Sequence, residues 1–252
     1  MPNWSIDPET GQRHLGRYGW KAAKGTVRQQ AAGAFLQDLG ITTPAFKSVG
    51  CQRGTSDCKT SMVTPSISAA ELDRISSYLQ LLGVPAQRKY PSGYTDGAVT
   101  PPEHRITANT QASIELGRKL FAQSACTACH VAELKTGKFH PLAELRNQVI
   151  HPYTDVLLHD MGPELADTLT EGQASPNMWR TQPLWGLGSL KYVQKGTGFA
   201  DPESVRYLHD GRARTLMEAI AWHGGEASSS RAKFEAMTKS ARDAVIAFLE
   251  SL

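Results

Sequence analysis

Apolar residues recur at helical spacing in five stretches of this chain, with polar or glycine-rich segments between them. Thr26, Ser68 and Thr215 stand where an N-cap would begin three of these helices, and the last two are followed three residues later by a glutamate, as in a capping box. The chain is therefore predicted to be mostly α-helical. The predicted helices and their buried faces are residues 26–40 with Val27, Ala31, Ala34, Phe35 and Leu39; residues 68–82 with Leu72, Ile75, Leu79 and Leu82; residues 110–123 with Ile114, Leu120 and Phe121; residues 215–223 with Leu216, Ala219, Ile220 and His223; and residues 240–251 with Val245, Phe248 and Leu249.

The segments between these helices suggest two structural units. Residues 1–25 are rich in glycine and aromatic residues without clean periodicity, so they are predicted to form an irregular wrapping segment. Proline and glycine with little apolar content mark residues 91–106 as a linker. The expected division is a first unit over residues 1–90 and a second over residues 107–252.

Composition narrows the function. The 252 residues suffice for two small cores, and the net charge of +3 comes from lysines and arginines scattered along the chain. Nucleic-acid binding normally needs a concentrated basic surface, so nucleic acid is not an expected partner. No apolar run approaches the length of a membrane span, and none is predicted.

The strongest chemical signal is the run of Cys126, Cys129 and His130, the attachment pattern of a c-type haem. On one helical turn both sulfurs can reach the vinyl edge of a porphyrin as thioethers, and the adjoining imidazole can bind the iron. A zinc site is the alternative, but the chain has no second cysteine pair or histidine pair at zinc-binding spacing to complete it. The pattern therefore predicts covalently bound haem c.

The other two cysteines, Cys51 and Cys58, flank a short polar turn. A disulfide between them is predicted, and closing so short a loop would stabilise the protein by about 2–3 kcal/mol. Two free surface thiols are the alternative, whereas a haem site is excluded because no histidine follows Cys58. Covalent haem and disulfides both form outside the reducing cytosol, so a periplasmic or otherwise exported protein is expected. Residues 1–4 do not resemble a signal peptide, so a leader or a preceding domain is expected to be missing from this sequence.

The sixth ligand of the iron decides what such a haem does, because a second histidine lowers the potential, a methionine raises it and an open position admits peroxide. His223 is the first candidate because it lies on the predicted buried stripe of a short helix. Met161, in a loop of glycine and proline, is the second. A core histidine bonded to a backbone carbonyl, or a plain core methionine, would explain the same two residues without haem.

Other residues near the predicted haem have less specific patterns. Trp179, Trp185 and Trp222 could pack on a haem edge, although tryptophan as ordinary core explains them as well. Arg180, Arg212 and Arg214 could pair with haem propionates or remain surface charges. His159 and His209 each precede an aspartate and are predicted to be oriented by a carboxylate. The remaining histidines are treated as surface or local hydrogen-bonding residues: His14, His104, His140 and His151.

Several longer runs resemble the bacterial di-haem oxidoreductases, also labelled thiol oxidoreductases, over nearly the whole chain. That family is similar in turn to the di-haem cytochrome c peroxidases and to the di-haem enzyme of methylamine utilisation. The runs that carry the resemblance are residues 16–21, 150–155, 158–163, 183–186, 207–212 and 222–227.

The resemblance implies two cytochrome c modules, with residues 107–252 forming the C-terminal one and residues 1–90 the remainder of a preceding α-rich module. In the relatives the distal ligand lies fourteen residues after the histidine of a Tyr-x-His-x-Gly element, and here that position is His223, which implies bis-His ligation. The family carries two haem motifs and this chain has one, so the chain is expected to be the C-terminal part of a di-haem protein.

The implied partners are the second haem module and a redox protein, with Ca²⁺ between domains as a further ligand that no acidic loop here locates. The function implied is one-electron transfer within a haem-dependent oxidoreductase. A peroxidase with an open or labile distal site and a mono-haem electron carrier without catalysis are the alternatives. A structural haem in a binding module would be a third class, and nothing in these residues supports a thiol substrate.

Overall fold

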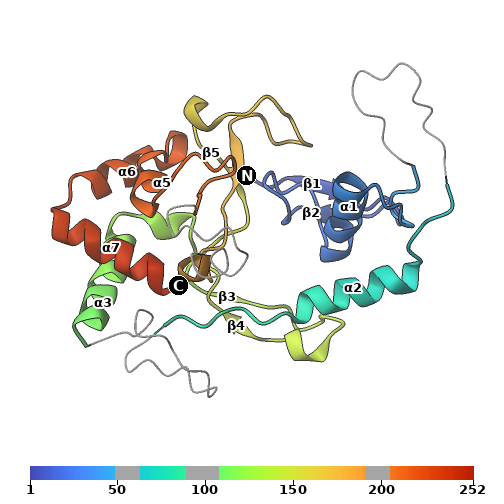
Figure 1. Cartoon of the computed structure of the whole chain (residues 1–252), viewed down its shortest axis with the longest axis horizontal. Helices are drawn as coiled ribbons and strands as arrows, with labels where there is room; N and C mark the ends of the chain where they lie inside the picture. The colour runs from blue at the N-terminus through green and yellow to red at the C-terminus, as the bar shows by residue number, and fades with distance from the viewer. Residues whose placement is uncertain (49–62, 89–107, 191–204) are drawn as a thin grey trace.

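The computed structural model describes residues 1–48, 63–88, 108–190 and 205–252 (Figure 1). Over these residues the chain is mostly α-helical, as predicted, with three small antiparallel sheets of two strands each. The helices are α1 (Val27–Leu39), α2 (Ala69–Leu81), α3 (Ala108–Gln123), α5 (Leu216–Ala221), α6 (Ser228–Glu235) and α7 (Lys239–Ser251). The strand pairs are β1 (Trp4–Ile6) with β2 (Arg13–Leu15), β3 (Leu134–Lys135) with β4 (Val149–Ile150), and β5 (Leu158–Asp160) with β6 (Met178–Arg180).

The main core lies where α3 crosses α7. Helices α3, α5, α6 and α7 gather on one side of the molecule, and α1 and α2 lie on the other (Figure 1). At the crossing, a Cβ built on Gly117 would lie 1.9 Å from the carbonyl oxygen of Ala244, so only glycine permits this approach. The rings of Phe121 and Phe248 meet one turn further on, with centroids 5.4 Å apart. This contact confirms the predicted burial of both residues.

The predicted helix starts are confirmed by the hydrogen bonds at the caps. Thr26 accepts a hydrogen bond from the Gln29 amide, and Gly40 ends α1 in the left-handed region at φ 67°. Ser68 and Glu71 form both halves of the capping box of α2. The predicted helices over residues 110–123 and 240–251 correspond to α3 and α7 within two residues at each end.

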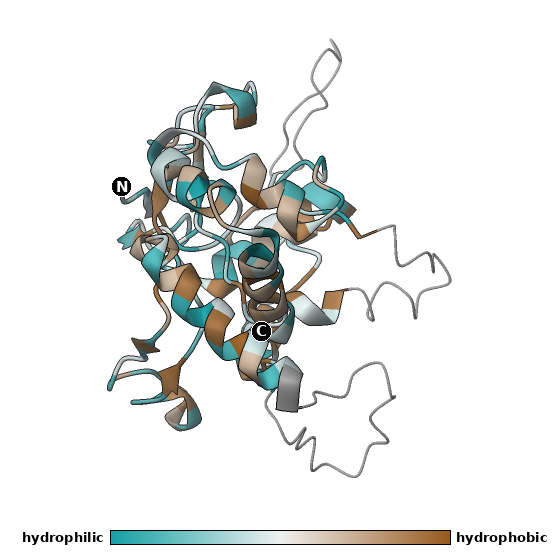
Figure 2. Cartoon of the chain, turned by 90° about the vertical axis from the view of Figure 1, so that its left-hand side faces the viewer, coloured by the Kyte–Doolittle hydropathy of each residue, from teal (hydrophilic) through white to brown (hydrophobic). Residues whose placement is uncertain are grey.

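Two predicted buried faces are wrong in part. Leu39 on α1 is 65% exposed, whereas Ala31 and Ala32 are buried against Leu72 of α2. Leu79 and Leu82 of the α2 stripe are also exposed. The α1–α2 cluster is small, and Leu39, Leu79 and Leu82 lie outside it, so periodicity alone overstates how much of each stripe is covered. In Figure 2 the helices carry apolar and polar residues side by side along their length.

The capping of α5 and the helix that follows also differ from expectation. Thr215 caps α5 by accepting from the Glu218 amide, but the Glu218 carboxylate turns to the backbone N–H of Arg214 instead of completing the box. Residues 228–235 form α6, which no apolar pattern predicted because its serines and charged residues leave only Phe234 buried. Tertiary contact of Phe234 with the main core therefore decides this helix.

The N-terminal segment packs against strands from the distant half of the chain. Residues 1–25, expected to be irregular, contain the short β1–β2 hairpin. The Lys21 ammonium is buried and bonds to the carbonyls of Ser175, Pro176 and Met178 and to the Asp167 carboxylate at 3.2 Å. The two halves of the chain are therefore joined through polar groups that must stay paired.

Some predictions fall on residues outside the described ranges. The proposed linker over residues 91–106, the Cys51–Cys58 disulfide and His104 belong to this set. Among the described helices, none is both long and apolar enough to cross a membrane.

Candidate functional site

The haem motif lies immediately after α3. Helix α3 ends at Gln123, and Ala125 then takes a left-handed conformation at φ 62°, which turns the chain into a 3-10 helix over Cys126–Ala128. Both motif cysteines are free thiols and half-buried. Burial, together with the nearby Cys129, raises the pKa of Cys126 to about 11, so its thiol is protonated at neutral pH.

The imidazole of His130 is held by one nitrogen only. Its Nδ1 lies 2.9 Å from the carbonyl oxygen of Tyr153, which makes Nδ1 the donor and leaves Nε2 with the lone pair. Tyr153 reaches this position in a left-handed conformation at φ 53°, which is strained for a tyrosine. Burial, and secondarily the nearby His223, lower the pKa of His130 to about 4. The ring is therefore neutral at physiological pH, as a metal-binding histidine must be.

His223 is arranged in the same way. It follows α5, and its Nδ1 lies 2.8 Å from the carbonyl oxygen of Ala219. Burial lowers its pKa, and the guanidinium of Arg231 lowers it further. His223 also acts on His130 electrostatically, since it contributes to lowering the His130 pKa. Among the described residues, neither Nε2 atom makes a hydrogen bond.

These residues fit a haem. Two neutral imidazoles with free Nε2 atoms suit the two axial positions of an iron, and two free thiols stand one and four residues before the first imidazole. Phe121 packs near His130 with ring centroids 6.1 Å apart and supplies apolar surface. Arg231 Nε is the one buried side-chain nitrogen or oxygen without a hydrogen bond in the described part of the chain, and it lies 3.8 Å from the Glu235 carboxylate. A guanidinium nitrogen beside His223 that makes no hydrogen bond suits a propionate.

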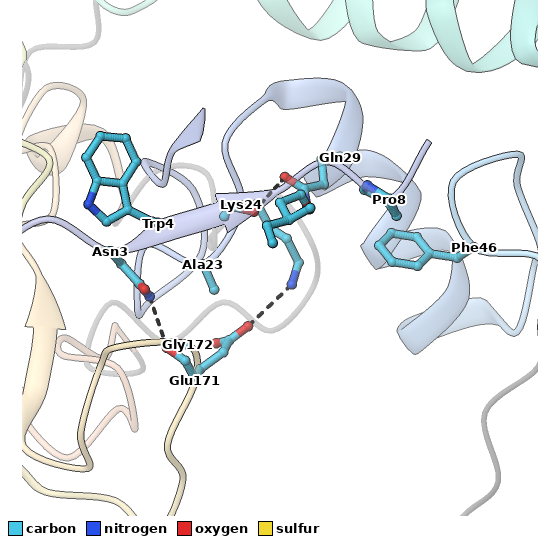
Figure 3. A pocket seen from close by; sticks show the side chains of 11 residues that line it. Asn3, Trp4, Pro8, Ala23, Lys24, Gln29, Phe46, Glu171 and Gly172 are labelled. Atoms are coloured by element: carbon cyan, nitrogen blue, oxygen red, sulfur yellow. Dashed lines mark hydrogen bonds and ion pairs between the residues drawn. The ribbon is translucent and has the colours of Figure 1, made fainter. Parts of the chain in front are cut away.

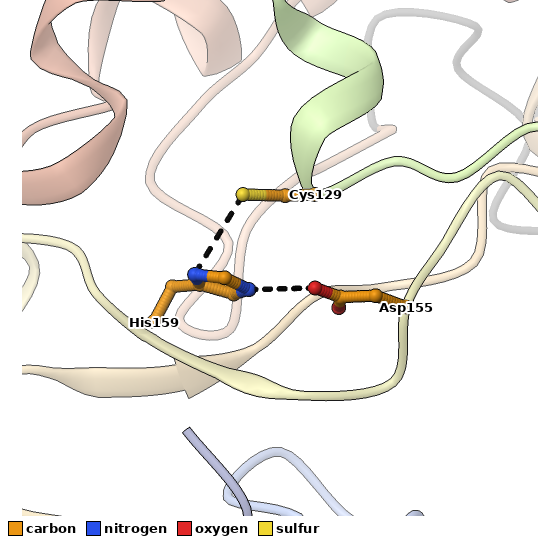
Figure 4. A group of neighbouring side chains, drawn as sticks. All are labelled: Cys129, Asp155 and His159. Carbon is orange, nitrogen blue, oxygen red and sulfur yellow. Dashed lines mark hydrogen bonds and ion pairs between the residues drawn. The ribbon is translucent and has the colours of Figure 1, made fainter.

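A charged cluster lies against the second motif cysteine (Figure 4). His159 on β5 directs Nδ1 toward Cys129 Sγ, 3.6 Å away, and Nε2 toward Asp155 Oδ2, 2.8 Å away. The same Nδ1 lies 2.8 Å from Glu226 Oε2. Hydrogen bonds that His159 donates to Asp155 first, and then to Cys129 and Glu226, raise its pKa to about 10. His159 is therefore an imidazolium between two carboxylates.

The turn after His223 packs backbone to backbone on the loop after β5. A Cβ on Gly225 would lie 2.2 Å from the carbonyl oxygen of Asp160, and one on Gly224 would lie 2.7 Å from that of Met161. Gly225 also has φ 51°. Two glycines are thus required for His223 to stand this close to β5.

A comparison with protein-family models decides the family. The model described as "Di-haem oxidoreductase, putative peroxidase" matches residues 4–252. The chain belongs to this di-haem oxidoreductase family. No curated protein matches, and no solved structure matches. Family membership supports haem binding, a general oxidoreductase role and an association with a second haem module.

The other residues expected at the haem of this oxidoreductase lie at different places. Met161 is beside the site, because its backbone touches Gly224. Trp185 is half-buried next to Leu184, which packs on the main core. Arg180 is tied to the N-terminal segment, because its Nε donates to the Gly19 carbonyl. Whether these three contact haem stays a prediction.

The remaining predicted arginines already have partners within the oxidoreductase. Arg212 donates to the Asp210 carboxylate at 2.6 Å and lies over the Trp222 ring. Arg214 pairs with Glu218 at the start of α5. Arg231, which the sequence did not indicate, lies nearer to His223: its Nη1 donates to the Ala221 carbonyl and its Nε makes no hydrogen bond. Its signal in the sequence is weak because α6 has no apolar stripe.

His209 lies near its neighbouring carboxylate as predicted, with Nε2 4.0 Å from Asp210 Oδ2, whereas His159 is oriented by carboxylates other than its neighbour's. His159 is held by Asp155 and Glu226, not by the adjacent Asp160. His209 stacks on Trp179 with centroids 3.6 Å apart, and Lys21 lies 3.9 Å from the same ring. His140 makes local hydrogen bonds with the Leu142 backbone, as expected, and also bonds to Gln80. Tyr153, Asp155 and Glu226 were missed because their roles depend on partners distant in sequence.

Two cavities lie in the described part of the oxidoreductase. One, of about 290 Å³, is formed by β1, the start of α1 and the turn at Glu171, where Lys24 and Glu171 are ion-paired (Figure 3). The other, of about 340 Å³, is apolar, and Phe121, Phe248 and Thr127 of the haem motif line it. The second cavity therefore adjoins the haem motif.

Proposed function

We propose that residues 107–252 form a cytochrome c-like domain that binds one haem c through Cys126 and Cys129 and passes single electrons. His130 and His223 would hold its iron. Residues 1–90 belong to the remainder of a preceding module, and the partner that exchanges electrons with this haem is a second haem module or a redox protein.

The observation that carries this proposal is the matched arrangement of the two imidazoles. Each gives its Nδ1 proton to a backbone carbonyl, from Tyr153 for His130 and from Ala219 for His223. Such a bond fixes the tautomer and the ring orientation, and it makes the other nitrogen a better donor to a metal. A plain core histidine would have no need for a second buried imidazole nearby.

The surrounding residues would keep the haem dry. The close crossing of α3 and α7 at Gly117 and the packing of Phe121 and Phe248 provide a rigid apolar wall beside His130. When bound, the haem supplies one-electron redox chemistry that no side chain of this chain can supply. The chain's own contribution is to attach, orient and shield it.

The optical and EPR spectra of the ferric protein test this assignment. We expect a low-spin spectrum from the wild type and a high-spin spectrum from His223→Ala. His140→Ala removes a histidine bonded to Gln80 outside the site and should leave the spectrum unchanged. If His223→Ala stays low-spin while Met161→Leu becomes high-spin, methionine is the ligand and bis-His ligation is refuted.

A peroxidase with an open or labile distal position is the second candidate. The family description names peroxidase activity. His223 lies between a helix of only six residues and two glycines. A peroxidase predicts a high-spin fraction and rapid reaction with hydrogen peroxide in stopped-flow measurements. A pure electron carrier should show neither.

We propose an exported location because thioether attachment takes place outside the cytosol. The Cys51–Cys58 disulfide and an inter-domain Ca²⁺ remain parts of the same proposal. Mass spectrometry of the exported protein, before and after reduction and alkylation, would test the haem attachment and the disulfide together. A mass equal to the polypeptide alone would refute covalent haem.

A further inference from the structure

Three charged side chains join the turn that follows His223 to the strand beside the haem motif. We propose that Asp155, His159 and Glu226 form a positioning network that holds His223 on the haem iron. The network thereby sets the fraction of protein molecules in which the iron lacks this second ligand. This inference rests on the proposed function and adds to it the residues that hold the second ligand in place.

The network is continuous in space. Asp155 Oδ2 and His159 Nε2 are 2.8 Å apart, and His159 Nδ1 and Glu226 Oε2 are also 2.8 Å apart. The second oxygen of Glu226 accepts the backbone N–H of Asp160 at 3.0 Å. Glu226 is therefore held by both of its oxygens, which fixes its direction as well as its position.

The ends of the network lie beside the two ligand-bearing segments. Asp155 lies two residues after Tyr153, whose carbonyl orients His130. Glu226 follows His223 by three residues, and its 3-10 helix, η7 (Gly225–Ala227), begins directly after Gly224. His159 stands between these segments and next to Cys129. A shift of Glu226 away from His159 would therefore carry the His223 turn with it.

The other contacts between this turn and the segment after β5 are made by backbone atoms. Gly224 and Gly225 have no side chains, and their contact with Asp160 and Met161 is backbone against backbone. Helix α5, which carries His223 at its end, is six residues long and too short to be stable by itself. The link through Glu226 is thus the main side-chain attachment of this turn to β5 among the described residues.

Charge strengthens the link. The hydrogen bonds of His159 lower the pKa of Asp155 and help to lower that of Glu226, and both carboxylates in turn raise the pKa of His159. An imidazolium between two carboxylates makes hydrogen bonds about twice as strong as those between neutral groups. The side chain of His159 is only 15% exposed, so solvent screens these pairs incompletely.

The test measures the spin state of the haem-loaded protein in Glu226→Gln, His159→Gln and Asp155→Asn. Each variant keeps the size of the side chain and removes a charge from the network. We expect the ratio of high-spin to low-spin ferric haem to rise about tenfold in each, which corresponds to about 1.4 kcal/mol. Added imidazole should bind about tenfold more tightly to the variants, because it competes with a more weakly held His223.

Asp243→Asn is the matched control. Asp243 pairs with Lys239 on α7 and is 50% exposed, close to the 54% of Glu226, but it lies outside the network. Its spin ratio should equal that of the wild type. The double variant His159→Gln with Glu226→Gln should show no more than the larger single effect, because both changes break one interaction.

The outcomes separate this inference from the proposed function. A high-spin His223→Ala protein together with wild-type spectra for Glu226→Gln and His159→Gln would overturn the network while leaving His223 as the ligand. A low-spin His223→Ala protein would overturn both. Should Glu226→Gln load too little haem, Asp155→Asn and imidazole titration of His159→Gln supply the same comparison, with spectra normalised to haem content.

Discussion

Replacing Gly117 with alanine tests the helix crossing on which the whole site stands. The new methyl group would lie 1.9 Å from the Ala244 carbonyl oxygen and 2.8 Å from Phe248 Cβ. Ordinary contact begins at 3.4 Å, so α3 and α7 must separate by about 1.5 Å. The oxygen belongs to the backbone of α7, and no side-chain rotation can relieve the clash.

Two opposing effects set the size of the change. Alanine in a helix interior is about 1 kcal/mol more favourable than glycine. Overpacking typically costs about 1–3 kcal/mol, and more where backbone must move, because the neighbouring Phe121–Phe248 contact also loosens. We expect a net loss of about 2 kcal/mol, which lowers the melting temperature by roughly 4–8 °C for a protein of this size.

The assay is urea and thermal unfolding followed by far-UV circular dichroism. Gly137→Ala is the control, because nothing lies within 4 Å of the place its new methyl group would take and its φ is not left-handed. The control should shift the free energy of unfolding by less than about 0.5 kcal/mol. A melting temperature for Gly117→Ala equal to or above that of the wild type would refute the close crossing of α3 and α7.

Two further predictions concern charged groups. The pKa of His159 is raised to about 10, so its ion pairs contribute fully to the stability of the protein below its ordinary pKa of about 6.5 and are lost as pH rises through about 10. The midpoint of urea unfolding should therefore fall between these two pH values. His159→Gln should make this fall smaller. A fall of equal steepness in the variant would show that another group is responsible. Lys21→Met leaves three carbonyls and Asp167 without their ammonium partner and should lower the free energy of unfolding in urea by about 3 kcal/mol. Lys24→Met removes the more exposed pair with Glu171 and should lower it by less than about 1 kcal/mol. Equal losses in the two lysine variants would contradict the role given to the buried ammonium.

Local signals in the sequence predicted the helix boundaries well. Thr26, Ser68 and Gly40 act through their own backbone neighbours, so a reader of the sequence can locate a helix start or end from them. The buried faces were predicted less well, as the exposed Leu39 and Leu82 show. Periodicity indicates which residues could be covered, but the size of the opposing surface decides which of them are.

The candidate site divides in the same way. The haem motif, and His223 at the end of an amphipathic stripe, are visible in the chain because their spacing is local. The carbonyls of Tyr153 and Ala219 that orient the two imidazoles differ in this respect: Ala219 is one helical turn before His223, whereas Tyr153 is 23 residues after His130. Only the Ala219 carbonyl could have been predicted from the sequence as a partner of its histidine.

By itself, the amino-acid sequence determined the mostly helical class and the family, and it located the cysteine and histidine motif. The tertiary structure alone decided which charges meet, because Glu226 is 67 residues from His159 along the chain. It also decided that Gly117, Gly224 and Gly225 must be glycines, since the atoms they avoid belong to other segments. Pairing between distant residues has no periodicity, so it exists only once the chain has folded.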